Sequence, residues 1–191
     1  MVKKSKKGYV RYLRIIRKIH RRTGMLLFVF FFIMGVTGLI LGWKKNSNGI
    51  ILPKSYVGTS ISLQDWLPIN TLQDIAFKTM QDSIDKNIDL ELQRIDIRPQ
   101  KGMVKFVFNN HYWGIQLDGS TGDVLAITKR RSDFFENIHD GSILDIIFKT
   151  KGEIIKLVYT SIMGLALIIF TLTGFWLWYG PKLIKKNKKN I

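Results

Sequence analysis

The chain lacks cysteine entirely and contains only three histidines in 191 residues. Without cysteine it can form no disulfide, no iron–sulfur cluster, no cysteine-ligated zinc site and no thiol nucleophile. Motifs for other nucleophiles, for phosphate-binding glycine loops and for nicotinamide or flavin cofactors are missing as well. The acidic residues show no metal-loop spacing, so metal or heme chemistry would depend on His20, His111 and His139.

Charge is missing from two long apolar runs. Residues 23–43 and 157–179 contain no Asp, Glu, Lys or Arg. At about 1.5 Å per residue, a helix of either length crosses the hydrocarbon core of a bilayer, which is roughly 30 Å thick. The first run is too long for a cleaved signal peptide and has no small-residue cleavage pattern. We therefore predict two transmembrane helices, the first of them a retained signal-anchor.

Acidic residues are absent from both tails. Residues 1–22 hold ten Lys and Arg, residues 180–191 hold five Lys, and all fourteen Asp and Glu lie between 44 and 156. Lys and Arg next to membrane spans mark the cytoplasmic side. We expect a bacterial cytoplasmic (inner) membrane protein with both termini in the cytoplasm and residues 44–156 outside. The net charge of +16 then reflects topology and contact with anionic lipid headgroups of the bilayer, and predicts no nucleic-acid partner.

The segment between the two runs predicts a small α+β domain. Residues 44–70, with turn-forming residues and prolines, indicate an extended connector. A helix is expected over 71–87 with Thr71 at its N-terminal cap, and an antiparallel meander is expected after it. The predicted strands are 94–98, 103–108, 112–117 and 123–128. A domain over 71–131, followed by an amphipathic membrane-surface segment over 132–156, completes the predicted organisation.

Several motifs occur in a fixed order around these elements. His20-Arg21-Arg22-Thr23-Gly24 opens the first span, Thr37-Gly38 and Thr173-Gly174 lie late in the spans, and His139-Asp140-Gly141 precedes the second span. The helix–strand–strand–strand order, ending in Gly114–Asp118 and Thr121–Leu125, resembles a PepSY domain. Together, over most of residues 11–180, these features resemble the PepSY-associated transmembrane (PepSY-TM) family. Arg22 stands where the family usually has an aromatic residue, and two spans make the chain similar to a minimal member.

The resemblance implies an α+β membrane protein in which two transmembrane helices flank a small extracytoplasmic PepSY-like domain. In longer members it also implies b-type heme held by membrane histidines, in reductases that help release iron from imported siderophores. On this interpretation His20 and His139 are heme-iron ligands, and the chain is an electron-transfer subunit supplied by quinol or a partner protein. The alternative is a non-catalytic, membrane-anchored interaction or accessory subunit, in which both histidines are ordinary residues of the membrane surface.

The predicted topology separates the two histidines. His20 lies before the first span on the cytoplasmic side and His139 before the second span on the outer side, so about 30 Å of hydrocarbon lies between them. They cannot bind one iron within one chain. A bis-histidine heme would need a second copy of the chain, as in a homodimer, or another membrane protein subunit. Gly38 and Gly42 form a G-x-x-x-G pattern that favours such packing, although small residues are frequent in membrane helices generally.

Overall fold

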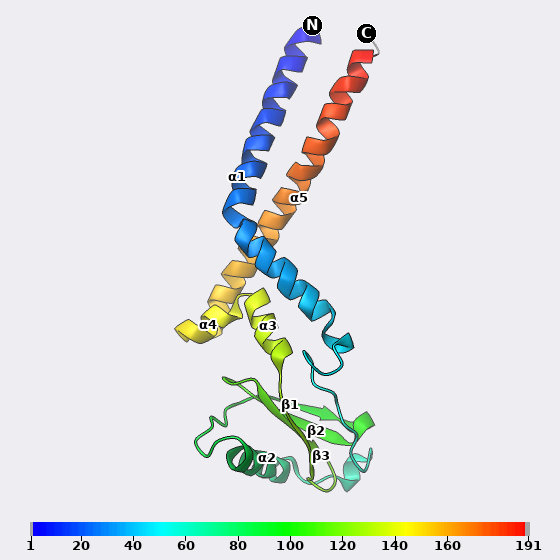
Figure 1. Cartoon of the computed structure of the whole chain (residues 1–191), viewed down its shortest axis with the longest axis vertical. Helices are drawn as coiled ribbons and strands as arrows, with labels where there is room; N and C mark the ends of the chain where they lie inside the picture. Colours follow the sequence, from blue (N-terminus) through cyan, green and yellow to red (C-terminus); the bar gives the residue numbers. More distant parts are fainter. Residues whose placement is uncertain (1, 190–191) are drawn as a thin grey trace. The chain divides into compact units, whose positions relative to one another are not determined.

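The computed structural model describes residues 2–189, with side chains for residues 8–183 and 185. The chain divides into two compact units, traced in Figure 1. The first unit is the chain up to Val36 together with the part from His139 onward, and it consists of helices. The second unit is Thr37–Ile138, which contains all the β-strands of the described residues.

Two long helices dominate the first unit. They are α1 (Val2–Gly42), whose last residues belong to the second unit, and α5 (Ile154–Lys189). The short helix α4 (Ser142–Phe148) and a 3-10 turn (Lys151–Glu153) precede α5. The parts Gly8–Gly42 and Lys151–Leu183 are long and apolar enough to cross a membrane, and they cover the predicted runs to within one residue. Only 6% and 11% of their most apolar windows are buried inside the chain, unlike the core helices of a soluble domain.

The helices α1 and α5 run antiparallel (Figure 1), and side chains of the two helices are in contact, in what we call the seam. Tyr9 lies beside Trp176 with ring centroids 6.5 Å apart, whereas Phe30 lies beside Tyr159 at 6.3 Å. The early part of α1 therefore contacts the late part of α5. The apolar residues buried along the helices are Leu13, Ile16, Met163 and Ala166. Because the basic stretches of the sequence adjoin the contacting ends, the helix pair carries its positive charge at one end.

A four-stranded antiparallel sheet forms the base of the second unit, in the order β1-β2-β3-β4. The strands are β1 (Leu92–Arg98), β2 (Met103–Phe108), β3 (Trp113–Asp118) and β4 (Val124–Lys129), which confirms the predicted meander. The helix α2 (Ile69–Ser83) precedes the sheet, and α3 (Arg131–His139) follows it. The predicted Thr71 cap is wrong: Pro68 is the N-cap, because its carbonyl oxygen already accepts the amide of Leu72 at 3.1 Å.

The hydrophobic core of this unit lies between α2 and one face of the sheet. Alternation along β2 points Val104, Phe106 and Phe108 toward α2, and each of these side chains is buried. The remaining buried members of the core are Leu72, Ala76, Met80, Ile115 and Leu117. Every residue of β2 is buried, so the opposite face of the sheet is covered too.

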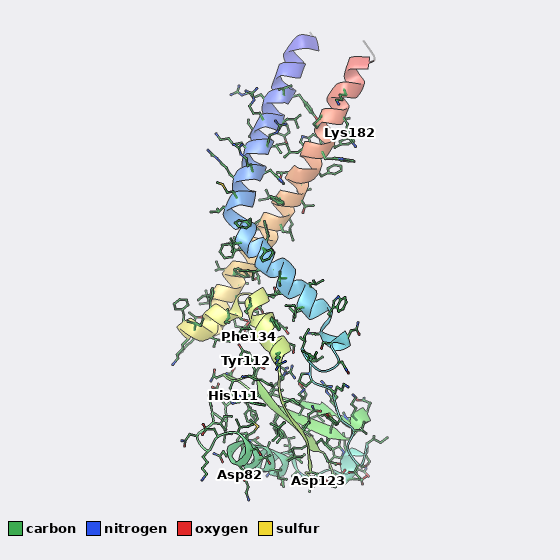
Figure 2. The ribbon with its side chains drawn as sticks, viewed as in Figure 1. Asp82, His111, Tyr112, Asp123, Phe134 and Lys182 are labelled. Carbon is green, nitrogen blue, oxygen red and sulfur yellow. The ribbon has the colours of Figure 1, made fainter. Side chains whose placement is uncertain are left out.

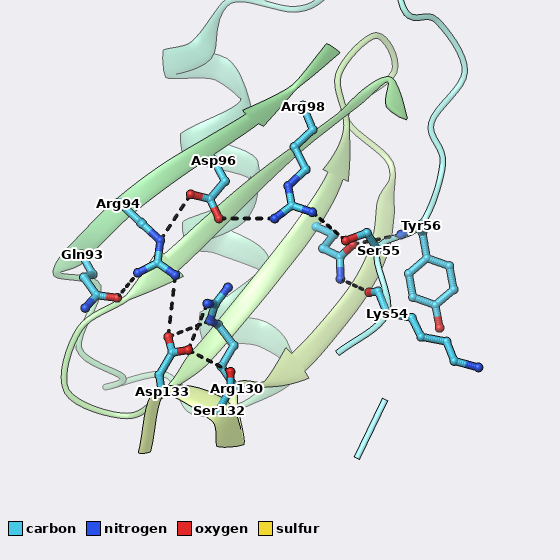
Figure 3. A network of polar contacts seen from close by, with 11 residues as sticks. Lys54, Ser55, Tyr56, Gln93, Arg94, Asp96, Arg98, Arg130, Ser132 and Asp133 are labelled. Carbon is cyan, nitrogen blue, oxygen red and sulfur yellow. Dashed lines mark hydrogen bonds and ion pairs between the residues drawn. The ribbon is translucent and has the colours of Figure 1, made fainter. Parts of the chain in front are cut away.

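That opposite face is polar, and the connector covers part of it (Figure 3). The side chain of Gln116 on β3 accepts a hydrogen bond from the amide of Tyr56 at 3.1 Å and donates one to the carbonyl of Lys54 at 2.8 Å. Arg98 on β1 donates to the hydroxyl of Ser55 at 2.9 Å. The connector is thus held to the sheet by side chains of β1 and β3.

Asp118, at the end of β3, holds a second part of the connector. Its buried carboxylate accepts the amide of Thr59 at 2.7 Å and the amide of Ser120 at 2.8 Å, together with the hydroxyl of Thr59. Burial opposes ionisation of this carboxyl, but the hydrogen bonds from Thr59, Ser120 and Thr121 outweigh burial and hold its pKa below the ordinary value. Asp118 is therefore a charged structural cap that joins the connector to the sheet.

Replacing Asp118 by Ala should destabilise the protein by about 2 kcal/mol, because several buried donors lose their charged acceptor. Because the folded protein lowers the pKa of Asp118, the ionised carboxylate stabilises the fold above the ordinary carboxyl pKa, and this stabilisation is lost as the pH falls below that value. In denaturant unfolding of the full chain in detergent, the free energies of unfolding of the wild type and of Asp118→Ala should therefore differ at pH 7, and this difference should shrink toward pH 3. Asp82→Ala, on the exposed surface of α2 (Figure 2), is the matched control and should change little. Equal effects of the two substitutions would contradict the assignment.

Candidate functional site

His20 lies on α1 within the seam between the two long helices. Its Nδ1 is 2.9 Å from the hydroxyl oxygen of Thr173 on α5. The Thr173 hydroxyl in turn lies 2.7 Å from the carbonyl oxygen of Ile169, to which it donates. Because the hydroxyl proton is used there, the Thr173 oxygen accepts from His20, and Nδ1 carries the proton when the imidazole is neutral. The lone pair of Nε2 is then left for another partner.

The ring of His20 is also fixed from one side. It stacks on Phe170 with centroids 3.9 Å apart and an interplanar angle of 20°, and Phe170 contacts Phe31 at 5.7 Å. A β-carbon added at Gly24 would lie 2.8 Å from Phe170, and one added at Gly174 would lie 3.4 Å from Cε1 of His20. The glycine of each motif thus leaves room for the aromatic rings. The His20–Gly24 and Thr173–Gly174 motifs form one contact between α1 and α5.

His139 ends α3 and begins a tight turn into α4. Gly141 has a φ of +81°, and a β-carbon there would lie 2.7 Å from Tyr159 of α5. The Asp140 carboxylate accepts the amide of Ser142 at 3.0 Å and lies 3.3 Å from the ammonium of Lys156. The His139-Asp140-Gly141 motif is therefore a turn that packs against the beginning of α5.

The two histidine motifs contact α5 at different levels. Gly141 meets Tyr159, whereas His20 meets Thr173, fourteen residues further along the helix. At about 1.5 Å per residue this is roughly 21 Å along the axis. Among the described residues, no group of three or more His, Asp or Glu side chains could hold a metal ion. The contact between α1 and α5 thus does not bring His20 and His139 together.

His111 belongs to the other unit, in the turn between β2 and β3 (Figure 2). Its Nε2 is 2.8 Å from the carbonyl oxygen of Asp89, and its Nδ1 accepts the amide of Trp113 at 3.2 Å. Both ring nitrogens are thus used to shape the turn. His111 is a structural residue of the domain.

Sequence reasoning identified His20 and the Thr173-Gly174 motif but did not pair them. It did not single out Tyr9, which lies in the same seam beside Trp176. The Tyr9 hydroxyl and the Trp176 indole nitrogen are buried and have no hydrogen-bond partner among the described residues. Buried polar groups are normally hydrogen-bonded, because leaving one without a partner is costly. The helical spacing of Tyr9, Leu13, Ile16 and His20 on α1 was the signal that could have placed them on one face.

A family model described as a PepSY-associated TM region matches residues 17–190 of the chain. The matched part includes the His20 and His139 motifs, the Thr173-Gly174 motif and the whole of the sheet. No curated protein and no solved structure matches the chain.

The close contact at Gly24 gives a test of the seam. Gly24→Ala should destabilise the helix pair by about 1 kcal/mol or more, because the new methyl group would overlap the Phe170 ring, which is also stacked on His20. Gly35→Ala is the matched control on the same helix, since nothing lies within 4 Å of its β-carbon position. Unfolding of both variants in detergent should separate them, and equal stability would show that the seam is not formed in the protein.

Proposed function

The chain belongs to the PepSY-associated transmembrane family, and on that premise we propose that it is a b-heme-binding electron-transfer subunit linked to siderophore iron reduction. Family membership and two helices long enough to cross a bilayer make it a membrane protein. The single observation that carries the heme proposal is the hydrogen bond between His20 and Thr173. An imidazole that ligates iron commonly donates its other ring N–H to a fixed acceptor.

The surroundings of His20 fit this role. The Thr173 hydroxyl orients the ring and leaves Nε2 as the ligating atom, while Phe170 stacks on one face of the imidazole. The unpartnered hydroxyl of Tyr9 and indole N–H of Trp176 could donate hydrogen bonds to a group that carries acceptors, as the propionates of heme do. When bound, heme b would supply one-electron transfer. The chain itself would hold the iron through His20 and keep the ring in place.

A second ligand would come from a second copy of the chain or from another membrane protein. The turn that follows His139 contacts α5 through Gly141, at a different level from His20, so His139 would serve in another copy or for another heme. Glycines with open surroundings support the packing of a further helix: nothing lies within 4 Å of the β-carbon positions of Gly42 on α1 and Gly164 on α5. A homodimer would place four apolar helices together, as in a four-helix bundle.

The proposed location is the bacterial cytoplasmic membrane, with both termini in the cytoplasm and residues 44–156 outside. Its support is the antiparallel contact of α1 and α5, which gathers positive charge at one end of the pair. A reporter that works only outside the cytoplasm should be inactive when fused after Ile191. The same reporter should be active when it replaces the chain after Lys129. Activity of the first fusion would contradict the proposed orientation.

Protein purified from heme-replete cells should show the Soret band of a b-type heme. His20→Ala should abolish the band, because the ligating nitrogen is lost. Thr173→Val should weaken heme binding about tenfold, because the ring loses the acceptor that orients it. His139→Ala should reduce the band if His139 supplies the opposing ligand or a second site. Heme titration with absorbance spectroscopy measures all three variants.

His111→Ala is the control for these variants, because this histidine belongs to an exposed turn of the domain. It should leave the heme spectrum unchanged. A colourless wild-type preparation that co-purifies with another membrane protein would contradict the heme proposal. That result would favour the alternative of a non-catalytic accessory subunit.

A further inference from the structure

Lys105 occupies the middle of β2 on the polar face of the sheet. Only 1% of its surface is exposed, and its ammonium makes no hydrogen bond and no ion pair with the described residues. Buried charged groups are normally paired, because removing an ammonium from water without a partner is costly. We therefore expect the Lys105 ammonium to bind a group that can accept its hydrogen bonds.

The neighbouring carboxylates are already used by arginines (Figure 3). Asp96 lies 3.3 Å from Arg94 and 3.9 Å from Arg98. Asp133 accepts two hydrogen bonds from Arg130, at 2.8 and 3.0 Å. Four cationic side chains, including Lys105, lie near these two carboxylates, and the third carboxylate of this face, Asp118, accepts hydrogen bonds from the connector. The local excess of positive charge matches an anion.

Two further polar side chains lie beside Lys105. A β-carbon at Gly114 would lie 3.7 Å from Cε of Lys105 and 3.6 Å from Cδ of Arg130, so both side chains run past this glycine. Gly114 pairs with Thr128 across β3 and β4, which places the Thr128 side chain on the same face. The Thr128 hydroxyl is buried and has no hydrogen-bond partner among the described residues. Lys105, Arg130 and Thr128 thus lie next to Gly114 on one face of the sheet.

We propose that Lys105, Arg130 and Thr128 form a binding site for a small oxyanion of the phosphate or carboxylate class. Lysine and arginine donors are the usual ligands of such oxygens, and a hydroxyl can supply a further hydrogen bond. The ligand must be small, because Lys105 and Arg130 are both buried. The site adjoins α3, since Arg130 also donates to Asp133 in the first turn of that helix.

The titration of Lys105 agrees with this arrangement. Burial, together with the charges of Arg130 and Arg98, lowers its pKa to about 8, against the smaller opposing effect of Asp96 and Asp133. A bound anion would favour the charged ammonium. Binding should therefore be strong at pH 7 and should weaken as the pH rises above 8, where the free protein loses this proton.

Calorimetric titration of the full chain in detergent tests the site, with inorganic phosphate as one probe and acetate as the other. Lys105→Met should weaken binding at least tenfold, and Thr128→Val should weaken it several-fold. Lys86→Met is the matched control, because Lys86 is an exposed lysine of the same domain, and it should bind like the wild type. Binding of both probes assigns the site to oxyanions in general, and binding of one identifies the preferred class.

Thermal unfolding gives a readout that does not depend on a binding signal. Phosphate or acetate, whichever binds, should raise the unfolding temperature of the wild type but not that of Lys105→Met. Between pH 7 and pH 9.5 the acetate effect should decline, and acetate itself does not titrate in this range. Absence of heat and of thermal shift with both anions in the folded wild type would overturn the proposal. Unchanged binding in Lys105→Met would overturn it as well.

Discussion

The hydrogen bond from His20 to Thr173 determines how the two long helices can meet. A polar side chain that is enclosed between two helices needs a hydrogen-bond partner there, and this contact is part-buried. The Thr173 hydroxyl satisfies the imidazole and is itself satisfied by the carbonyl of its own helix. Because this contact fixes both the facing surfaces and the ring orientation, the stacking of Phe170 and the small residues Gly24 and Gly174 follow from it.

The domain between the helices is organised by a different constraint, since its sheet has two covered faces of opposite character. α2 covers an apolar face, where burial of β2 side chains stabilises the fold. The other face carries Lys105 and Gln116, and the connector supplies backbone groups that satisfy Gln116. A one-residue slip of β2 would exchange these two faces, so the polar side chains also specify the register of the sheet.

The strands were predictable because alternation is a local property of the sequence, and the spans were predictable because a bilayer demands length and apolarity. The start of α2 was not predictable. Pro68 rather than Thr71 is its N-cap, and Pro68 acts through its backbone carbonyl, a group that every residue type has. The burial of Lys105 was not predictable either. A lysine that alternates with apolar residues indicates a solvated face, and only the covering by the connector and α3 reverses this.

The sequence by itself determined that the chain has two apolar spans, basic residues next to them in both terminal segments, a meander between them and two histidine motifs. Each of these depends on neighbouring residues and on the thickness or charge preference of the membrane. Only the tertiary structure decided that His20 meets Thr173, a residue 153 positions away, and that Lys105 is enclosed beside Arg130 and Thr128. Such contacts depend on how distant segments of the chain pack. No local pattern in the sequence specifies which distant residue His20 or Lys105 will meet.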